Sequence, residues 1–528
     1  MSEAPRTTLP PKWAIASLSE LAAINPPLDR CLVSDDVPVD FVPMRAVEPE
    51  GGGLLRPEVV NYGKVKKGFT AFLSGDVIMA KITPCMENGK TCVVPALSGV
   101  ACFGSTEFHV LRAEPGIGAR WIANYLLQHS TRYAAQRQMA GGVGQMRVPT
   151  SFLETLAVPV PPEPEQVRIL DMLDELLSDL DAGIATLERV RAKLKHYRAA
   201  VLKAAVEGAL TAEWRRQNPA TETAEALLTR ILAERRRRWE EVQLGKYEAA
   251  GKAPPKDWKA KYVEPVEPVA PDTSTLPALP EGWKWVSIDQ LSSEIRNGFS
   301  GKPDATTGIP ILRISAVRPY AIDLSDRRYL SGSVAEYESD QIASGDLLFT
   351  RYNGSRNLVG VCAVVPKIEE AIVHPDKIIR ARPLGILASS AFPGLSANVG
   401  VSRRYVEQRI RTTAGQAGIS GSDVKSLPVP LPPLSEQAAI MEYVEDQLSV
   451  IEHLERDLDG RLTSAQALRQ SILRQAFTGQ LVPQDPNDEP ASELLKSIGA
   501  ERDERARLAR AAKLAKPKSK TRRGAIQD

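Results

Sequence analysis

The sequence predicts an α+β protein in which two mixed α/β domains are joined by a pair of long antiparallel coiled-coil helices, internally duplicated with pseudo-two-fold symmetry. Three observations lead to this prediction. The sequence repeats itself at an offset of about 270 residues, two long stretches have the apolar spacing of coiled coils, and prolines cluster at the joints. The length of 528 residues is enough for three or four domain-sized units.

The internal repeat is clearest around the proline joints. LAVPVPPEPEQ at 156–166 matches LPVPLPPLSEQ at 427–437, and the match continues without a gap to RAAVLKAAVEGAL at 198–210 and RQSILRQAFTGQL at 469–481. Upstream, GDVIMAKIT at 75–83 resembles GDLLFTRYN. Solenoid repeats recur every ~20–50 residues, so a repeat this long indicates a duplicated domain.

Two long helices are predicted at 165–207 and 436–478. Their apolar residues alternate at spacings of three and four, as in a coiled-coil seam: Leu177, Leu180, Ile184, Leu187, Leu194, Val201 and Ala205, and then Val444, Leu448, Ile451, Leu458, Leu462, Ala465, Ile472 and Ala476. Gly208 and Gly479 stand where a helix C-terminus is expected. Each helix needs a partner for its apolar stripe, and the short joints favour antiparallel pairing of the two copies.

Three arginines fall on the predicted seam, namely Arg191, Arg198 and Arg469. An unpaired buried charge is costly. We therefore expect the apolar neighbours to take over the seam at these places, namely Val190, Tyr197 and Leu468.

The predicted domain order repeats once along the chain. Both globular segments mix short β-branched runs with helical stretches, which is typical of α+β domains. The predicted ranges are 1–155 for the first globular domain, 156–245 for the first helical region, 246–279 for a linker rich in Pro, Lys and Glu, 280–426 for the second globular domain, 427–512 for the second helical region, and 513–528 for a basic tail.

Composition excludes several classes of protein. Lys and Arg total 67 against 65 Asp and Glu, so a uniformly basic nucleic-acid coat is excluded, although local basic patches remain possible. Five cysteines are too few for a disulfide scaffold and suit a reducing compartment. The uncharged run at 383–401 contains proline and several glycines, so we expect no membrane helix and a cytoplasmic location.

The joint LPVPLPPLSEQ, the helix end RQSILRQAFTGQL and the segment GDLLFTRYNGS resemble the specificity (S) subunit of type I restriction–modification systems. The likeness covers essentially the whole chain, in the family's order of target-recognition domain and conserved helical region, twice over. It implies a DNA sequence-specificity subunit without a catalytic centre. Each target-recognition domain would read one half of a bipartite target, and the helices would set the spacer.

The resemblance also implies the partners. Double-stranded DNA, two methyltransferase (M) subunits and restriction/translocase (R) subunits are expected, and the assembled complex is expected to be an adenine-N6 DNA methyltransferase and endonuclease. S-adenosylmethionine, ATP and Mg are expected on the partner subunits, with no cofactor bound by this chain. The alternative is a duplicated protein-binding scaffold without DNA specificity.

Motifs for catalysis are incomplete. Asn25-Pro26-Pro27 resembles an adenine methyltransferase motif, but Leu28 cannot stack on a flipped base. Gly89-Lys90-Thr91 resembles a phosphate-binding loop, but Pro84 replaces its first glycine. Pro375-Asp376 lacks the later acidic residue of a nuclease site, and Cys85, Cys92, Cys102 and His109 lack the spacing of a zinc site. We expect no catalytic residue and no metal site.

DNA contacts are therefore expected from loops, where Arg, Asn, Gln and Lys can read base edges or hold phosphates. Lys81 in the first domain matches Arg351 in the second. The glycine-rich stretch 141–147 is similar in kind to 415–420. The candidate DNA-binding residues are Lys81, Gln145, Arg147, Arg351, Asn353, Ser355, Arg356, Gln416 and Ser420.

Overall fold

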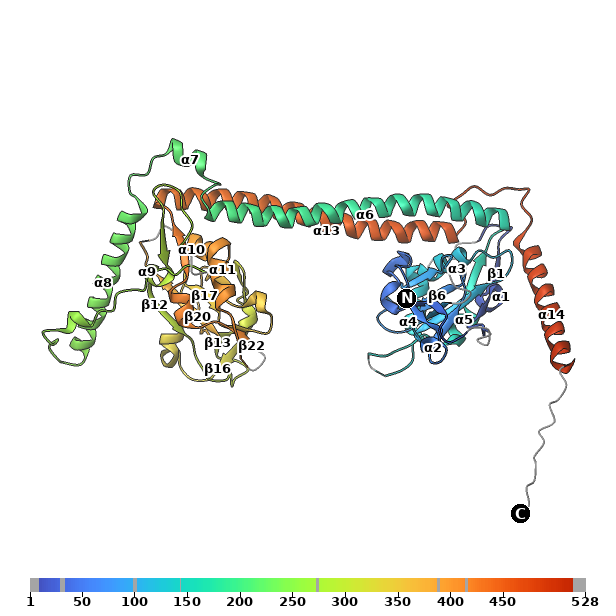
Figure 1. Cartoon of the computed structure of the whole chain (residues 1–528), viewed down its shortest axis with the longest axis horizontal. Coiled ribbons are helices and arrows are strands. Elements are labelled where there is room, and N and C mark those ends of the chain that lie inside the picture. Colours follow the sequence, from blue (N-terminus) through green and yellow to red (C-terminus); the bar gives the residue numbers. More distant parts are fainter. Residues whose placement is uncertain are drawn as a thin grey trace, which may run out of the picture. The chain divides into compact units, whose positions relative to one another are not determined.

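The computed structural model describes residues 9–28, 34–97, 102–142, 144–271, 275–386, 390–413 and 416–515 (Figure 1). Most of the predicted basic tail, 513–528, lies outside the described residues, as do Val143 and Gly415 of the glycine-rich stretches. The chain divides into two units. Unit 1 takes Met1–Glu188 and Asp459–Asp528, and unit 2 takes Arg189–Leu458.

Two helices of 44 residues form the predicted pair, α6 (Glu163–Val206) and α13 (Leu434–Phe477). Each begins two residues before its predicted start. In α6 the amide of Gln166 already donates to the carbonyl of Pro162, which closes an earlier turn. Gly208 and Gly479 follow the two helices with φ of +74° and +69°, so the predicted glycine stops are confirmed.

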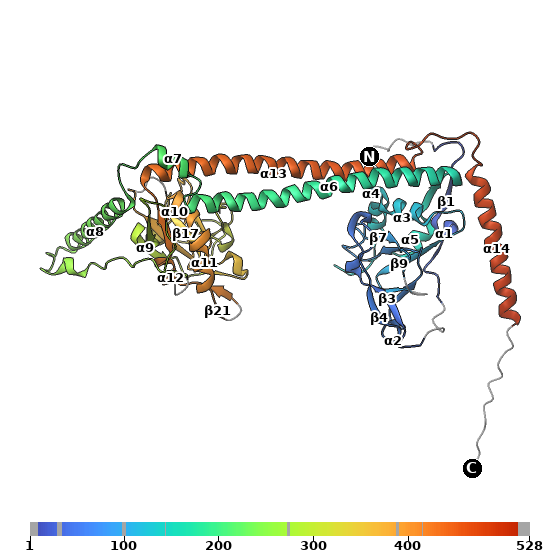
Figure 2. The same ribbon diagram turned by 45° about the horizontal axis from the view of Figure 1, so that its top comes forward.

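The antiparallel pairing is visible inside each unit. In unit 1, Asp181 from the first half of α6 forms an ion pair with Arg469 near the end of α13. In unit 2, Arg198 near the end of α6 lies 3.2 Å from Glu455 in the first half of α13. Early residues thus face late residues in both units, and Figures 1 and 2 show the two ribbons side by side. The predicted antiparallel pair is confirmed.

The prediction that apolar neighbours replace the seam arginines is wrong. Val190, Tyr197 and Leu468 are 40%, 50% and 51% exposed, whereas the Arg469 side chain is only 12% exposed. Arg198 and Arg469 stay at the seam because the facing helix supplies carboxylates for both. With these partners the two guanidinium groups are neutralised, so neither carries the cost of an unpaired buried charge.

The globular segment of unit 1 is built on two four-stranded sheets. One has the order β2 (Ala22–Ile24), β9 (Phe108–Ala113), β6 (Val77–Ala80) and β7 (Thr91–Val93). The other has the order β4 (Glu58–Asn61), β3 (Pro38–Val42), β8 (Cys102–Gly104) and β5 (Thr70–Phe72). A separate pair joins β1 (Ala14–Ser17) to β10 (Ala157–Val160). The helices are α1 (Leu18–Leu21), α2 (Tyr62–Val65), α3 (Ala119–Leu127), α4 (His129–Arg137) and α5 (Thr150–Thr155).

The globular segment of unit 2 repeats the first of these sheets, in the order β12 (Ser292–Asn297), β20 (Ile378–Pro383), β17 (Leu347–Thr350) and β19 (Cys362–Val364). The smaller sheets are β11 (Lys284–Ser287) with β23 (Pro428–Leu431), β13 (Ile309–Leu312) with β16 (Arg327–Leu330), β14 (Val317–Arg318) with β15 (Ala321–Ile322), and β18 (Tyr352–Asn353), β22 (Gln416–Gly418) and β21 (Arg411–Thr413). The helices are α9 (Ile288–Leu291), α10 (Ala391–Ser396), α11 (Gly400–Arg409) and α12 (Gly421–Lys425).

The duplication extends to individual contacts. Ala14 lies opposite Val160 in unit 1, and Lys284 lies opposite Leu431 in unit 2. Both units also carry the same bidentate ion pair beneath the four-stranded sheet: Arg112 with Asp76, and Arg382 with Asp346. In both units a tryptophan indole donates to the glutamate of the proline joint: Trp13 to Glu165 at 3.1 Å, and Trp283 to Glu436 at 2.8 Å.

The last helix of each repeat packs on the globular segment of the other repeat. The first residue of α14 (Ala491–Ala515) donates its amide to the carbonyl of Lys12 at 2.9 Å in unit 1. The first residue of α8 (Ala224–Ala249) donates to the carbonyl of Gly282 at 3.0 Å in unit 2. Figure 1 shows α14 beside β1 and α8 beside β12. Each unit is therefore assembled from parts of both repeats.

The stretch 246–279, predicted as a linker, follows the surface of unit 2 where it is described. Trp258 in a short 3-10 helix (Trp258–Lys261) stacks on Trp239 of α8 at 5.9 Å. Further on, the amide of Val269 donates to the carbonyl of Ser426. In the described part of the chain, no helix combines the length and the apolar character that crossing a membrane requires.

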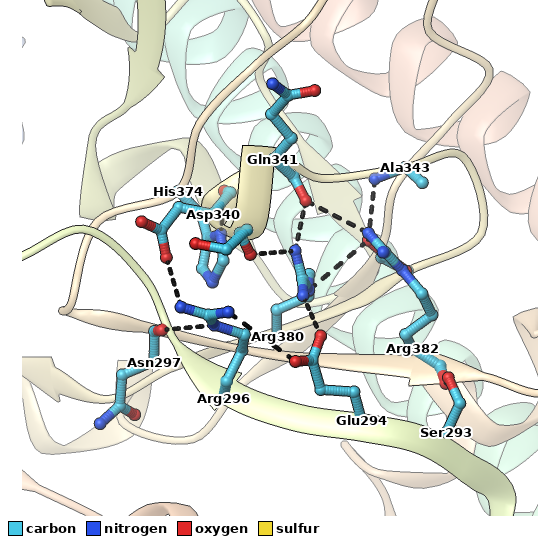
Figure 3. A network of polar contacts seen from close by, with 12 residues as sticks. Ser293, Glu294, Arg296, Asn297, Asp340, Gln341, Ala343, His374, Arg380 and Arg382 are labelled. Carbon is cyan, nitrogen blue, oxygen red and sulfur yellow. Dashed lines mark hydrogen bonds and ion pairs between the residues drawn. The ribbon is translucent and has the colours of Figure 1, made fainter. Parts of the chain in front are cut away.

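A charged network ties strands of unit 2 together (Figure 3). Arg380 of β20 is 1% exposed, and its guanidinium contacts the Glu294 carboxylate of β12 and the carbonyl of Gln341. Arg382, two residues along the same strand, also donates to the Gln341 carbonyl, at 3.2 Å. The network thus fixes the loop before β17 to the sheet.

His374 lies beside this charged network and has a neutral imidazole. It is fully buried, and its Nδ1 donates to the Asp340 carbonyl at 2.6 Å. Arg296 contacts the carboxylate of the same aspartate at 3.0 Å. Burial lowers the pKa of His374 to about 3, because a charged imidazolium would lose its hydration there.

Candidate nucleic-acid interface

Each unit carries a short hairpin at the same place in its fold. In unit 1 Ala140 pairs with Arg147, and Arg147 also pairs with Ile82, just after β6. In unit 2 Arg411 pairs with Gly418, and Gly418 also pairs with Tyr352, just after β17. We call residues 140–147 and 411–418 the glycine hairpins. A two-stranded ribbon is one of the shapes that a DNA major groove admits.

The predicted residues Gln145 and Gln416 occupy equivalent positions on the glycine hairpins, 271 residues apart. Both side chains are exposed. Two glycines with left-handed backbone shape the first hairpin, Gly141 at φ +135° and Gly144 at φ +81°. The folds therefore bring these two amides to matching sites, where they can donate to and accept from base edges.

Arg147 is held in a bidentate ion pair with Glu107, with both N–O distances at 2.8 Å. Its remaining terminal nitrogen donates to the carbonyl of Gln145 at 3.1 Å. The Arg147 guanidinium lowers the pKa of the Glu107 carboxyl below its ordinary value. In unit 1, then, the arginine at the base of the hairpin is neutralised and fixed in place. Its DNA contact stays a prediction.

Lys81 and Arg351 follow the equivalent strands β6 and β17, as the repeat predicts. The backbone of Lys81 bonds to Glu107 and Val148, which fixes the start of its side chain. Arg351 lies over the ring of Tyr352, with 4.8 Å between its guanidinium carbon and the ring centroid. Its Nε is buried without a hydrogen-bond partner. This cation–π contact restrains the guanidinium, which can present a planar donor set to a base edge.

One substitution between the repeats changes the charge at this place. Glu107 of unit 1 corresponds to Lys377 of unit 2, 270 residues later. The Lys377 carbonyl accepts the amide of Arg351, so the two basic residues are neighbours. Unit 2 therefore has two cations, Arg351 and Lys377, where unit 1 has one cation and one carboxylate, Lys81 and Glu107.

The predicted loop residues Asn353, Ser355 and Arg356 lie beside the second glycine hairpin. The amide of Ser355 donates to Asn353 Oδ1 at 3.0 Å, which closes an Asx turn. Arg356 donates to the carbonyl of Glu407 at 3.0 Å, so the loop is tied to α11. Ser355 and Arg356 are exposed. Gly354 between them and Asn353 also faces open space, since a Cβ at this position would have no described atom within 4 Å outside its chain neighbours.

Ser420 has a structural use in the fold. Its hydroxyl accepts the amide of Asp423, and Asp423 accepts the amide of Ser420 at 2.8 Å, which makes a capping box for α12. Sequence reasoning also missed two residues of this surface, Lys377 and Arg411. The offset of 270–271 residues was the signal for both, because it aligns them with Glu107 and Ala140.

Residues of the incomplete catalytic motifs have structural partners. Asn25 accepts the amide of Val110 at 3.0 Å, and its amide nitrogen lies 3.2 Å from His109. Lys90 donates to the carbonyls of Met44 and Val47. Burial raises the pKa of the Cys92 thiol to about 12, and so disfavours the thiolate that binds metals.

The comparisons with known proteins agree with one another. Residues 34–190 match the model of the type I restriction modification DNA specificity domain. The EcoKI specificity subunit of Escherichia coli strain K12 is 33% identical over 473 residues, which are 85% of this chain and 88% of that protein. The EcoEI specificity subunit of Escherichia coli is 30% identical over 509 residues, which are 87% and 80% of the two chains.

The fold also matches a solved structure described under "Structural basis underlying complex assembly and conformational transition of the type I R-M system". The TM-score is 0.58 at 19% sequence identity, and the match covers 90% of this chain and 99% of the other. At this identity the likeness supports the fold.

Proposed function

Because this chain belongs to the family of type I restriction–modification specificity subunits, we propose that its two globular segments each read one half of a bipartite DNA target. The chain is a DNA target-recognition subunit, and in this family catalysis belongs to other subunits. None of these relatives supports the alternative of a protein-binding scaffold.

One observation carries the bipartite proposal. The two glycine hairpins have the same pairing and the same glutamine, but different neighbours: Glu107 and Ala140 in unit 1 correspond to Lys377 and Arg411 in unit 2. Equal scaffolds with unequal hydrogen-bonding groups are suited to reading two different base sequences. The target should therefore have two unlike halves.

The test is a domain exchange. Residues 10–155 are replaced by the corresponding segment of another specificity subunit, and methylated sites are mapped across the host genome. One half-site should change, while the other and the spacer should stay. A change in both half-sites would contradict modular readout.

We also propose that α6 and α13 set the spacer between the half-sites, since each is one continuous helix. An insertion of seven residues in each helix, after Glu188 in α6 and after Asp459 in α13, keeps the heptad pattern. It lengthens each helix by about 10.5 Å. At ~3.4 Å per base pair the spacer should lengthen by about three base pairs. An unchanged spacer in an active insertion variant would refute this role.

The partners are part of the proposal. We propose that the chain works in the cytoplasm with two M subunits and with R subunits, and that S-adenosylmethionine, ATP and Mg bind to those partners. The family membership supports assembly into a restriction–modification complex. A mobility-shift assay with a target duplex, with and without M subunits, tests the DNA and subunit parts together.

A further inference from the structure

A second basic surface lies in unit 2, and its lining residues are distinct from those of the second glycine hairpin. A cleft of about 460 Å³ separates the end of α6 from the start of α11. Five basic side chains line it: Lys195, Arg198 and Lys203 from α6, and Arg403 and Arg404 from α11. Among the described residues, no carboxylate lines this cleft. We call it the basic cleft.

In the part of the chain that the structure describes, three of the five cations lie beside a carboxylate and two do not. Arg198 pairs with Glu455, Arg403 with Glu407 at 3.0 Å, and Lys203 lies 3.9 Å from Glu207. Lys195 and Arg404 are exposed, and within the described residues neither has an ion pair. The cleft therefore offers two available positive charges beside Arg198 and Arg403, which are already held in position.

The neutral groups of the cleft also suit an anion. Gly400 opens α11 on the cleft wall; the preceding Val399 provides no side-chain cap, and the first turn has no acidic residue. The positive end of the helix dipole is thus left without a negative partner from its own sequence. Tyr320 lines the same cleft, and its phenolic hydroxyl can donate a hydrogen bond to an anion.

The equivalent cleft of unit 1 serves as an internal comparison. It is lined by four carboxylates, from Glu48, Glu50, Asp181 and Glu188. Glu50 stands where unit 2 has Tyr320, and both residues have left-handed backbone, at φ of +53° and +68°. Glu50 holds Arg132 in a bidentate pair, and Asp181 holds Arg469. The same place in the fold is therefore neutralised in unit 1 and basic in unit 2.

We propose that the basic cleft binds a phosphate of the DNA backbone, held by Lys195 and Arg404 beside the positioned Arg198 and Arg403. This inference rests on the proposed function, because it assigns a further part of the same DNA to this chain. A phosphodiester fits better than a free nucleotide: Lys195 and Arg404 are exposed, whereas small ligands are usually buried over most of their surface. Lysine and arginine hold phosphates without reading sequence.

The test compares two double variants in the full-length chain, alone and with its M subunits. Lys195→Ala with Arg404→Ala removes the available charges, and Gln466→Ala with Tyr133→Ala changes the equivalent positions of unit 1. Binding to target and to unrelated duplexes is measured over a range of salt. The first variant should make the negative slope of log affinity against log salt shallower by about 1.8, as expected for two lost phosphate contacts. The affinity loss should be equal for both duplexes, and the unit 1 variant should keep the original slope.

Three outcomes would overturn the proposal. An unchanged slope in the first variant would show that DNA does not reach the cleft. A loss confined to the target duplex would make the two residues readers of bases. Binding of inorganic phosphate that the variant loses while its DNA slope is unchanged would make the cleft a site for a free anion. If the unaltered chain binds no duplex in either form, the proposed function itself fails.

Discussion

Arg469 of α13 forms an ion pair with Asp181 of α6, and the equivalent residues of the other repeat, Arg198 and Glu452, lie 3.7 Å apart in unit 2. Both long helices begin acidic and end basic. This order complements the dipole of each helix, and antiparallel pairing brings the acidic start of one against the basic end of the other. Charge therefore favours the antiparallel arrangement over the parallel one.

Reversing one charge of this pair should destabilise unit 1. Arg469→Glu puts two carboxylates opposite each other, and we expect a loss of about 1 kcal/mol, since the Asp181 side chain is 55% exposed and solvent screens it. Adding Asp181→Arg to this variant should recover most of the lost stability, because the ion pair is re-formed with its charges exchanged. Urea unfolding of the single and double variants measures both effects. No recovery in the double variant would mean that Arg469 acts through packing alone.

The glycine that ends α13 should not tolerate a side chain. Gly479 has φ of +69°, and a Cβ at this position would overlap the ring of Pro10. Gly479→Ala should cost at least ~1–2 kcal/mol from the backbone alone. Gly183→Ala is the matched control, because Gly183 lies inside α6 with no atom within 4 Å of an added Cβ. It should stabilise the chain by about 0.5–1 kcal/mol. Thermal unfolding of both variants provides the comparison, and equal effects would contradict the prediction.

Arg351→Ala should relax specificity in one half of the target. A guanidinium contact with a base edge is worth ~1–3 kcal/mol of discrimination, and the contact of Arg351 with the Tyr352 ring restrains its guanidinium. Affinities for duplexes with single base changes in each half-site would measure it. Equal losses for all sequences with a reduced salt slope would instead make Arg351 a phosphate contact.

His374 should make the stability of unit 2 depend on pH. Its pKa is about 3 in the folded protein, against an ordinary value of 6.5. Below pH 6.5 the unfolded chain takes up a proton that the folded chain refuses, so stability should fall as the pH drops from 6.5 towards 3. His374→Asn should flatten this part of the profile, measured as denaturant midpoints at several pH values. The same change at the exposed His196 is the control and should leave the profile as it is. An equal slope in the His374 variant would assign the proton uptake to other groups.

The features that sequence alone determined are local or periodic. The apolar spacing and the glycine stops placed α6 and α13 to within two residues, because helix length depends on neighbours three and four positions away. The repeat itself matched Lys81 with Arg351, and the glycine-rich stretch 141–147 with 415–420, before any fold was known.

What only the tertiary structure decided involves residues far apart in the chain. The contact of Ala491 with Lys12 shows that each unit is assembled from parts of both repeats, and no local pattern encodes it. The seam arginines could be placed correctly only once Asp181 and Glu455 were seen to face them. Arg404 is an available cation, whereas Arg132 is neutralised by Glu50. This difference depends on which carboxylates folding brings near each arginine, because Coulomb attraction acts over distances in space and not along the sequence.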